Sequence, residues 1–188
     1  MCLFFIPLSS AQSINQPRRG VTHRFYTGRP VFTFGFGLSY TSWKYGLAAS
    51  PASVSLAPLR ALVAQTHAAN RTFVARDWLL AAAPPARYQV NVTNTGSVDS
   101  DEVVLGFLVP PGAGIGGVPL QSLFGFSRVR VRAGESEVVE LYPELLEYSQ
   151  VDRMGRRYAL SGEYTVRFGV KQTATMGGGF VEHRLTAA

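Results

Sequence analysis

The chain has 188 residues, of which 46% are hydrophobic and 16% charged, so its composition is that of a folded protein and not of a disordered one. It is basic, with 18 Lys and Arg against 12 Asp and Glu. These basic residues fall in small groups with acidic neighbours, which favours a solvated surface over a nucleic-acid interface. The single cysteine excludes an intramolecular disulfide, and no apolar run approaches the ~20 residues that span a bilayer.

Residues 1–22 are expected to be unstructured or an artificial start. Met1–Leu8 is apolar, and Ala11-Gln12-Ser13 resembles the end of a signal peptide. No basic residue precedes the apolar run, however, and Pro7 interrupts it. Gln16–Gly20 is polar and turn-rich, as in a linker. A signal peptide therefore remains the second interpretation of this segment.

An aromatic stretch follows, in which phenylalanines alternate with Thr33 and Gly35. In an extended chain Phe32, Phe34 and Phe36 would share one side, and the glycines would let the backbone approach another surface closely. Periodicity alone favours an edge strand packed on its own domain. The alternative is a segment that docks on a neighbouring domain.

Structure is expected to resume with a strand at Leu38–Tyr45, which has aromatic residues on both faces. Residues 50–86 are Ala-rich and less informative, with a short helix expected at Leu59–Gln65 because Leu59, Leu62 and Val63 share a helical face. We interpret this region as an elaborated connection between the first two strands.

Alternating apolar residues predict the later strands, at 87–95, 102–109, 123–131, 136–142, 164–170 and 180–185. The turn at Arg132–Glu135 predicts a hairpin between 123–131 and 136–142, and Pro143–Tyr148 suits one helical turn. Six or seven short strands with regular turns favour a β-sandwich. Its core is predicted from the strand faces to contain Val90, Val92, Val104, Phe107, Val139, Val166 and Phe168.

Several of these segments, in this order, resemble the C-terminal domain of glycoside hydrolase family 3. The similar segments are Arg24–Phe32 with Phe34–Thr41, Val90–Gly96, Glu102–Leu105, Pro119-Leu120 with Leu123–Phe126, Ala133–Ser136 and Gly162–Val166. The resemblance implies an all-β, immunoglobulin-like (fibronectin type III-like) sandwich over 38–188 with an extended N-terminal arm. Residues 23–37 would then be the linker from an α/β domain that this chain lacks.

This resemblance implies an accessory domain of a retaining glycosidase that removes terminal β-linked sugars. Gly155-Arg156-Arg157 and the Pro110-Pro111 loop look more like the β-xylosidase branch, which acts in xylan breakdown, than the β-glucosidase branch. The aspartate nucleophile, the glutamate acid/base and the partner surfaces would belong to the upstream catalytic domains. An extracellular parent enzyme is expected.

The chain itself carries no catalytic motif of that family. Asp77, in Arg76-Asp77-Trp78, imitates the family nucleophile but follows the linker, so we interpret it as a surface carboxylate. The histidines are scattered, without the spacing of a metal site. The glycines of 112–117 lack the Lys-Ser/Thr of a phosphate-binding loop. The acidic cluster at 99–102 is typical of a polar turn, with a calcium site as the alternative. We therefore expect no cofactor or metal.

Two kinds of site residue are predicted. Five aromatic side chains are expected to dock on the upstream domain: Phe25, Tyr26, Phe32, Phe34 and Phe36. Asn70 and Asn91 satisfy the N-glycosylation pattern, which matters only for a secreted eukaryotic parent. The hypothesis from a different class is a free-standing carbohydrate- or protein-binding module, which an exposed coplanar row of aromatics would favour.

Overall fold

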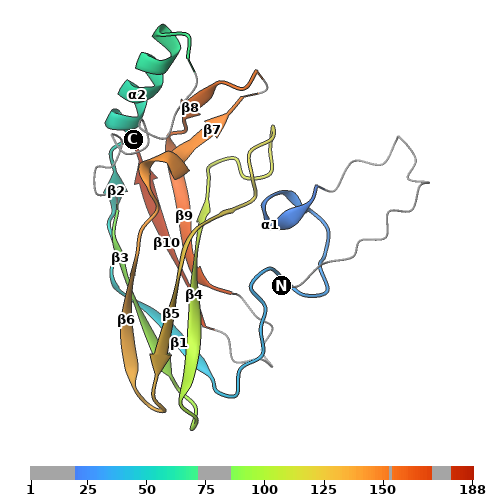
Figure 1. The fold of residues 1–188 in the computed structure, drawn as a ribbon, viewed down its shortest axis with the longest axis vertical. Helices are drawn as coiled ribbons and strands as arrows, with labels where there is room; N and C mark the ends of the chain where they lie inside the picture. Colours follow the sequence, from blue (N-terminus) through green and yellow to red (C-terminus); the bar gives the residue numbers. More distant parts are fainter. Residues whose placement is uncertain (1–19, 72–85, 153, 171–178) are drawn as a thin grey trace, which may run out of the picture.

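The computed structural model describes residues 20–71, 86–152, 154–170 and 179–188, and these residues are largely β-strand (Figure 1). A three-stranded sheet has the order β1 (Trp43–Ala49), β3 (Tyr88–Asn94), β6 (Ser136–Leu141). A five-stranded sheet has the order β2 (Ser53–Val54), β10 (Phe180–Ala187), β9 (Gly162–Gly169), β4 (Ser100–Val109), β5 (Ser122–Val131). Neighbouring strands are antiparallel except β2 and β10, which are parallel.

The remaining elements are short. β7 (Ser149–Val151) and β8 (Arg157–Ala159) pair as a small hairpin. The helices are α1 (Thr22–Phe25), α2 (Ala57–Ala68) and the 3-10 turn η1 (Leu145–Tyr148). α2 contains the predicted helix and buries Leu59, Leu62 and Val63 as expected.

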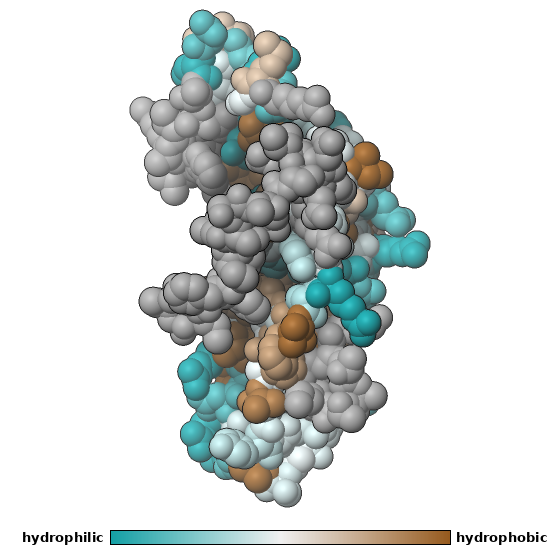
Figure 2. Space-filling model, turned by 90° about the vertical axis from the view of Figure 1, so that its right-hand side faces the viewer, coloured by the Kyte–Doolittle hydropathy of each residue, from teal (hydrophilic) through white to brown (hydrophobic). Residues whose placement is uncertain are grey.

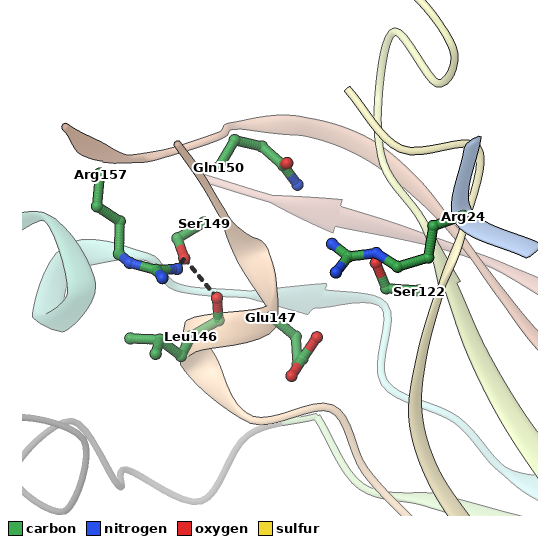
Figure 3. Close-up of a pocket in the computed structure, with 7 residues that line it drawn as sticks. All are labelled: Arg24, Ser122, Leu146, Glu147, Ser149, Gln150 and Arg157. Atoms are coloured by element: carbon green, nitrogen blue, oxygen red, sulfur yellow. Dashed lines mark hydrogen bonds between the residues drawn. The ribbon is translucent and has the colours of Figure 1, made fainter. Parts of the chain in front are cut away.

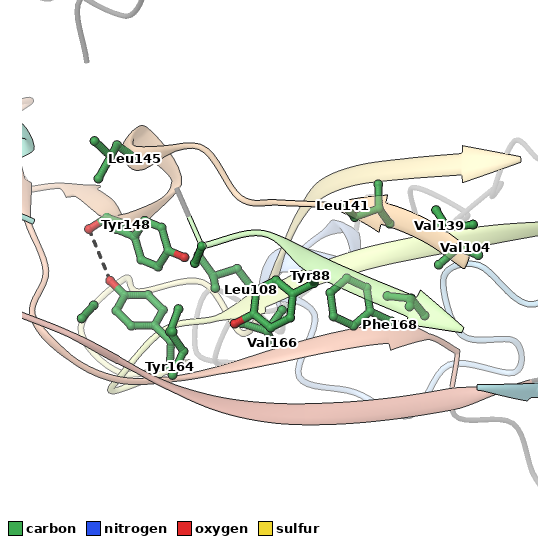
Figure 4. Packing of buried hydrophobic residues seen from close by; sticks show 14 of the residues in the cluster. Tyr88, Val104, Leu108, Val139, Leu141, Leu145, Tyr148, Tyr164, Val166 and Phe168 are labelled. Carbon is green, nitrogen blue, oxygen red and sulfur yellow. Dashed lines mark hydrogen bonds between the residues drawn. The ribbon is translucent and has the colours of Figure 1, made fainter. Parts of the chain in front are cut away.

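One hydrophobic core lies between the two larger sheets (Figure 4). Alternate residues of each strand point into it because successive side chains of a strand face opposite ways. Tyr88 of β3 and Phe168 of β9 meet there with ring centroids 5.2 Å apart. Six of the predicted core residues are members of this cluster: Val90, Val92, Val104, Val139, Val166 and Phe168.

Phe107 is the exception. It is buried, but it contacts the N-terminal segment on the outer face of the five-stranded sheet instead of the core. It lies three positions after Val104, an odd number, so the two side chains are on opposite sides of β4. Leu108 occupies the inward position that the sequence analysis assigned to Phe107.

The predicted hairpin between 123–131 and 136–142 is wrong. β5 pairs with β4 in the five-stranded sheet, whereas β6 pairs with β3 in the three-stranded sheet, so the turn at Arg132–Glu135 crosses from one sheet to the other. The connection from β3 to β4 crosses in the opposite direction. Asn94, fully buried at the end of β3, holds the two crossings together through hydrogen bonds to Val98 and Val131.

The first strand also differs from its prediction. β1 begins at Trp43, and Leu38 and Tyr40 before it are strongly exposed, so the aromatic pattern of 38–45 overstated the length of strand in this region. At the end of β5 valine and arginine alternate between the two faces, because Val131 is buried while Arg128, Arg130 and Arg132 are exposed.

Candidate functional site

The N-terminal arm, residues 20–40, runs along the outer face of the five-stranded sheet, beside β4 and β5 (Figure 1). The backbone N–H of Leu120, in the loop before β5, donates to the carbonyl of Arg24 at 2.7 Å. This hydrogen bond ties α1 to that loop.

Phe34 and Gly35 anchor the centre of the arm. The Phe34 ring stacks on His23 at 4.2 Å, and both rings meet the edge of Phe107 at 6.1 Å between centroids. Gly35 has φ +84°, and a Cβ there would come within 2.5 Å of Leu105 and 2.7 Å of Val170. Only glycine fits this close approach. Burial, followed by the charge of Arg24, lowers the pKa of His23, so the stacked imidazole is neutral near pH 7.

The arm is not fully extended at this point. Phe36 N–H donates to the Thr33 carbonyl in a turn, which brings the Phe32 and Phe36 rings to 4.6 Å while Phe34 points to the sheet. The sequence analysis placed all three rings on one side of an extended segment. The turn therefore corrects that expectation, and it leaves Phe32 more outward than Phe34.

Much of the aromatic surface stays exposed. Phe32 is 52% exposed and Phe34 47%, and Phe25 is also exposed, whereas Tyr26 and Phe36 are half-buried. Figure 2 shows several hydrophobic residues, separated by hydrophilic ones, on the side of the molecule that carries the arm. We name as the apolar face six of the exposed apolar side chains of the arm and of the adjoining strands β4 and β5: Phe25, Val31, Phe32, Phe34, Val103 and Phe126.

A polar pocket of about 200 Å³ lies beside α1 (Figure 3). Five elements or their borders contribute to it: α1, the start of β5, η1, β7 and β8. The lining residues are Arg24, Ser122, Leu146, Glu147, Ser149, Gln150 and Arg157. All except Leu146 have polar or charged side chains.

The charges in this pocket influence one another. Burial raises the pKa of Glu147, Arg24 and Arg157 counteract the rise, and Glu144 adds to it. Burial also lowers the pKa of Arg157, against the effect of Glu147. Arg157 Nη1 donates to Ser149 Oγ at 2.6 Å, and Ser149 Oγ donates to the carbonyl of Leu146. One side of the pocket is thus fixed by hydrogen bonds within the chain.

Each carboxylate of the acidic cluster at the start of β4 has a partner within the chain. Asp99 accepts from Ala133 N–H at 2.9 Å, Asp101 pairs with Arg128 at 2.9 Å, and Glu102 accepts from the Tyr45 hydroxyl at 2.7 Å. The three carboxylates point to three different partners. Within the described residues, no group of three or more His, Cys, Asp and Glu could hold a metal ion.

The other predicted positions lie apart from the arm and the pocket. Asn91 is half-buried in the middle of β3, on the opposite face from Val90 and Val92. Asn70 is exposed just after α2, with φ +47°, and Thr72 of its acceptor pattern lies outside the described residues. Asp77 also lies outside them. No helix in the described part of the chain is long and apolar enough to cross a membrane.

Comparison with known proteins connects the chain to glycosidases. No protein-family model matches it. It is 34% identical to β-D-xylosidase 1 of Arabidopsis thaliana over 155 residues, which are 80% of this chain and 20% of that protein. It is 30% identical to a probable exo-1,4-β-xylosidase of Aspergillus fumigatus, over 82% of this chain and 19% of that protein. The chain thus spans about a fifth of the curated relatives it matches.

The fold recurs in solved β-glucosidases. The structure of a β-glucosidase from Erythrobacter marinus matches with a TM-score of 0.60 and 24% identity, over 87% of this chain and 18% of that one. A β-D-glucoside glucohydrolase from Trichoderma reesei matches with a TM-score of 0.59 and 20% identity, over 85% of this chain and 20% of that one. The chain is therefore related to one part of the β-xylosidases, and its fold is found in β-glucosidases.

Proposed function

We propose that the chain is the C-terminal, fibronectin type III-like accessory domain of a family 3 glycoside hydrolase of the β-xylosidase branch. Residues 38–188 form the immunoglobulin-like sandwich, and 23–37 are the linker from an upstream α/β domain. The observation that carries the proposal is the 34% identity over 80% of this chain to a β-xylosidase of which it spans only 20%. Two sheets packed over one core are the arrangement that such a sandwich requires.

In this role the apolar face docks on the upstream catalytic domains and buttresses them. Phe25, Phe32 and Phe34 remain exposed after the arm has covered Phe107, so apolar surface is left for a further contact. Clustered apolar side chains of this kind mark interaction surfaces. The catalysis, the substrate and an extracellular location belong in this proposal to the parent enzyme.

The alternative, a free-standing carbohydrate-binding module, receives less support from the geometry. Phe32 and Phe36 are tilted by 34° to each other, and Phe34 is engaged with His23. They do not form the coplanar row on which a sugar chain would stack. Retardation of the chain in a xylan affinity gel, abolished by Phe32→Ala, would favour the module over the accessory domain.

The purified chain is expected to hydrolyse neither aryl β-xylosides nor aryl β-glucosides, because retaining glycosidases need two carboxyl groups ~5–5.5 Å apart and the chain lacks the family motifs that supply them. The assay measures aglycone release, with the Arabidopsis relative as the positive control. Turnover by this chain that Glu147→Gln or Asp101→Asn abolishes would overturn the accessory role.

Two observations test the docking proposal: the coding sequence upstream of this chain, and the effect of a substitution on the apolar face of the longer protein. The coding sequence upstream of Met1 is expected to continue in frame into an α/β domain. In that longer protein, Phe32→Asp is expected to weaken the domain contact, seen as faster protease cleavage near the arm and a lower midpoint of thermal inactivation. A charge buried in an apolar contact is costly.

Val138→Asp is the matched control for this docking test. Val138 is 56% exposed, close to the value for Phe32, but it lies on β6 in the other sheet, so its replacement should leave the domain contact unchanged. An upstream reading frame without an α/β domain, or equal effects of the two substitutions, would contradict docking through the apolar face.

A further inference from the structure

We propose that the polar pocket beside α1 binds a neutral polyhydroxylated ring, such as a single pyranose sugar. The inference rests on the pocket alone and is independent of whether the apolar face docks on another domain. Its basis is the combination of a carboxylate, guanidinium groups, an amide and hydroxyls around one small cavity.

The lining groups converge from distant parts of the chain. In Figure 3 the side chains of Arg24, Glu147 and Gln150 point into the same space, with Ser122 beside Arg24. They come from α1, η1, β7 and the first residue of β5. Since no single element presents them, the pocket is a product of the tertiary fold.

Glu147 is the one carboxylate among the lining residues. Glu147 is partly buried, and burial is the largest influence on its pKa. Arg24 acts on it through its charge, but no ion pair joins the two side chains within the described residues. A partly desolvated carboxylate and a guanidinium thus face the same cavity, and a ligand between them would supply the hydrogen bonds that each lacks from the other.

A hydroxyl group fits both sides, because it donates to a carboxylate and accepts from a guanidinium. Neighbouring hydroxyls on one ring could therefore bridge Glu147, Arg24 and the Gln150 amide together. Arg157 donates to Ser149 on one side of the pocket, so Glu147 and Arg24 are the charges that face the open space. A negatively charged ligand would meet Glu147 and a positively charged one would meet Arg24, so a neutral ligand is favoured. Leu146 is the one apolar lining residue, which disfavours an apolar ligand.

The size of the cavity limits the ligand further. At about 200 Å³ the cavity is smaller than the ~300–1,000 Å³ typical of sites for drug-sized ligands. It suits one ring and not an oligosaccharide. The hydrogen bond from Leu120 N–H to the Arg24 carbonyl holds the backbone on the arm side of the pocket in place.

The test is a titration of the ¹⁵N-labelled 188-residue chain, with D-glucose and D-xylose as probes and D-glucuronate as the charged comparison. Saturable shifts are expected for the backbone amides of Ser122, Glu147 and Gln150, with dissociation constants of millimolar order for the neutral sugars. D-glucuronate is expected to bind more weakly than D-glucose because it adds a carboxylate next to Glu147.

Two substitutions in the pocket and one outside it decide the outcome. Arg24→Ala and Glu147→Gln are each expected to weaken D-glucose binding about tenfold or more, as loss of a hydrogen bond to a charged group does. Arg128→Ala, on the exposed face of β5, is expected to leave it unchanged. The spectrum of each variant shows whether it is folded before sugar is added.

Three results would overturn the proposal. The first is the absence of shifts at pocket amides with either neutral sugar. The second is binding that neither pocket substitution weakens, and the third is tighter binding of D-glucuronate than of D-glucose. None of these results bears on the docking test, which alters Phe32 on the arm.

Discussion

Phe168→Ala is expected to lower the free energy of unfolding by about 3–5 kcal/mol, as truncation of a buried phenylalanine does. Phe168 is fully buried on β9, 5.2 Å from the Tyr88 ring and 6.0 Å from the Phe124 ring, so it joins β9 to strands of both larger sheets. Removal of the ring leaves a cavity between β3, β5 and β9, and the surrounding side chains can fill it only in part. Because a small domain has a total stability of about 5–15 kcal/mol, urea denaturation should show a large shift of the midpoint.

Phe126→Ala is the matched control for this prediction. It removes the same side chain from β5, a strand of the same sheet, at a position that is 68% exposed on the outer face. Its effect is expected to stay within about 0.5 kcal/mol, as for most surface substitutions. Equal effects of the two changes would mean that the assigned inward and outward faces of the sheet are wrong.

The strands that the sequence predicted well are those with one buried face. In β3 and β9, apolar residues alternate with polar ones, and the structure buries Val90, Val92, Val166 and Phe168 accordingly. Alternation with period two is a local property that any strand with one buried face must show. β2 and the hairpin of β7 and β8 are too short to produce it, so they were not predicted.

Strand partners were harder to predict than strands. The turn at Arg132–Glu135 has the residues of a tight hairpin, but β5 and β6 belong to different sheets. Turn chemistry fixes the local reversal of the chain, whereas the core decides the sheet that each strand joins. The same limit explains Phe107, whose apolar character suits the core and also the contact with His23 and Phe34.

The two functional features differ in the same way. The aromatic arm was visible in the sequence because Phe32, Phe34 and Phe36 are close together in it. The polar pocket was not, because Arg24, Ser122 and Glu147 are far apart along the chain and none belongs to a motif. Only the approach of α1 to η1 and β5 brings them to one cavity, and no pattern in the sequence predicts that approach.

Asn94→Ala is expected to lower the free energy of unfolding by about 3 kcal/mol, because it leaves several buried polar groups without partners and each such group costs ~1–3 kcal/mol before partial relaxation. Asn94 is fully buried. Its Nδ2 donates to the carbonyls of Val98 at 2.8 Å and Val131 at 3.1 Å. Its Oδ1 accepts from the Gly96 N–H at 3.1 Å and from the Thr41 hydroxyl.

These bonds join the end of β3 to three other segments: the residues before β1, the connection into β4 and the end of β5. Asn94→Asp separates the two halves of the amide. It keeps the oxygen that accepts from Gly96 and Thr41 but replaces the Nδ2 donor with a second oxygen, which faces the carbonyls of Val98 and Val131. The aspartate variant is therefore expected to be destabilised at least as much as the alanine variant at neutral pH, and to recover part of the loss at low pH, where a protonated carboxyl can donate.

Asn91→Ala, a half-buried position on the same strand, is the control and should cost about 0.5 kcal/mol or less. If urea denaturation gave Asn94→Ala the same small cost as Asn91→Ala, the crossings between the sheets would depend on the apolar core alone and not on this hydrogen-bond network.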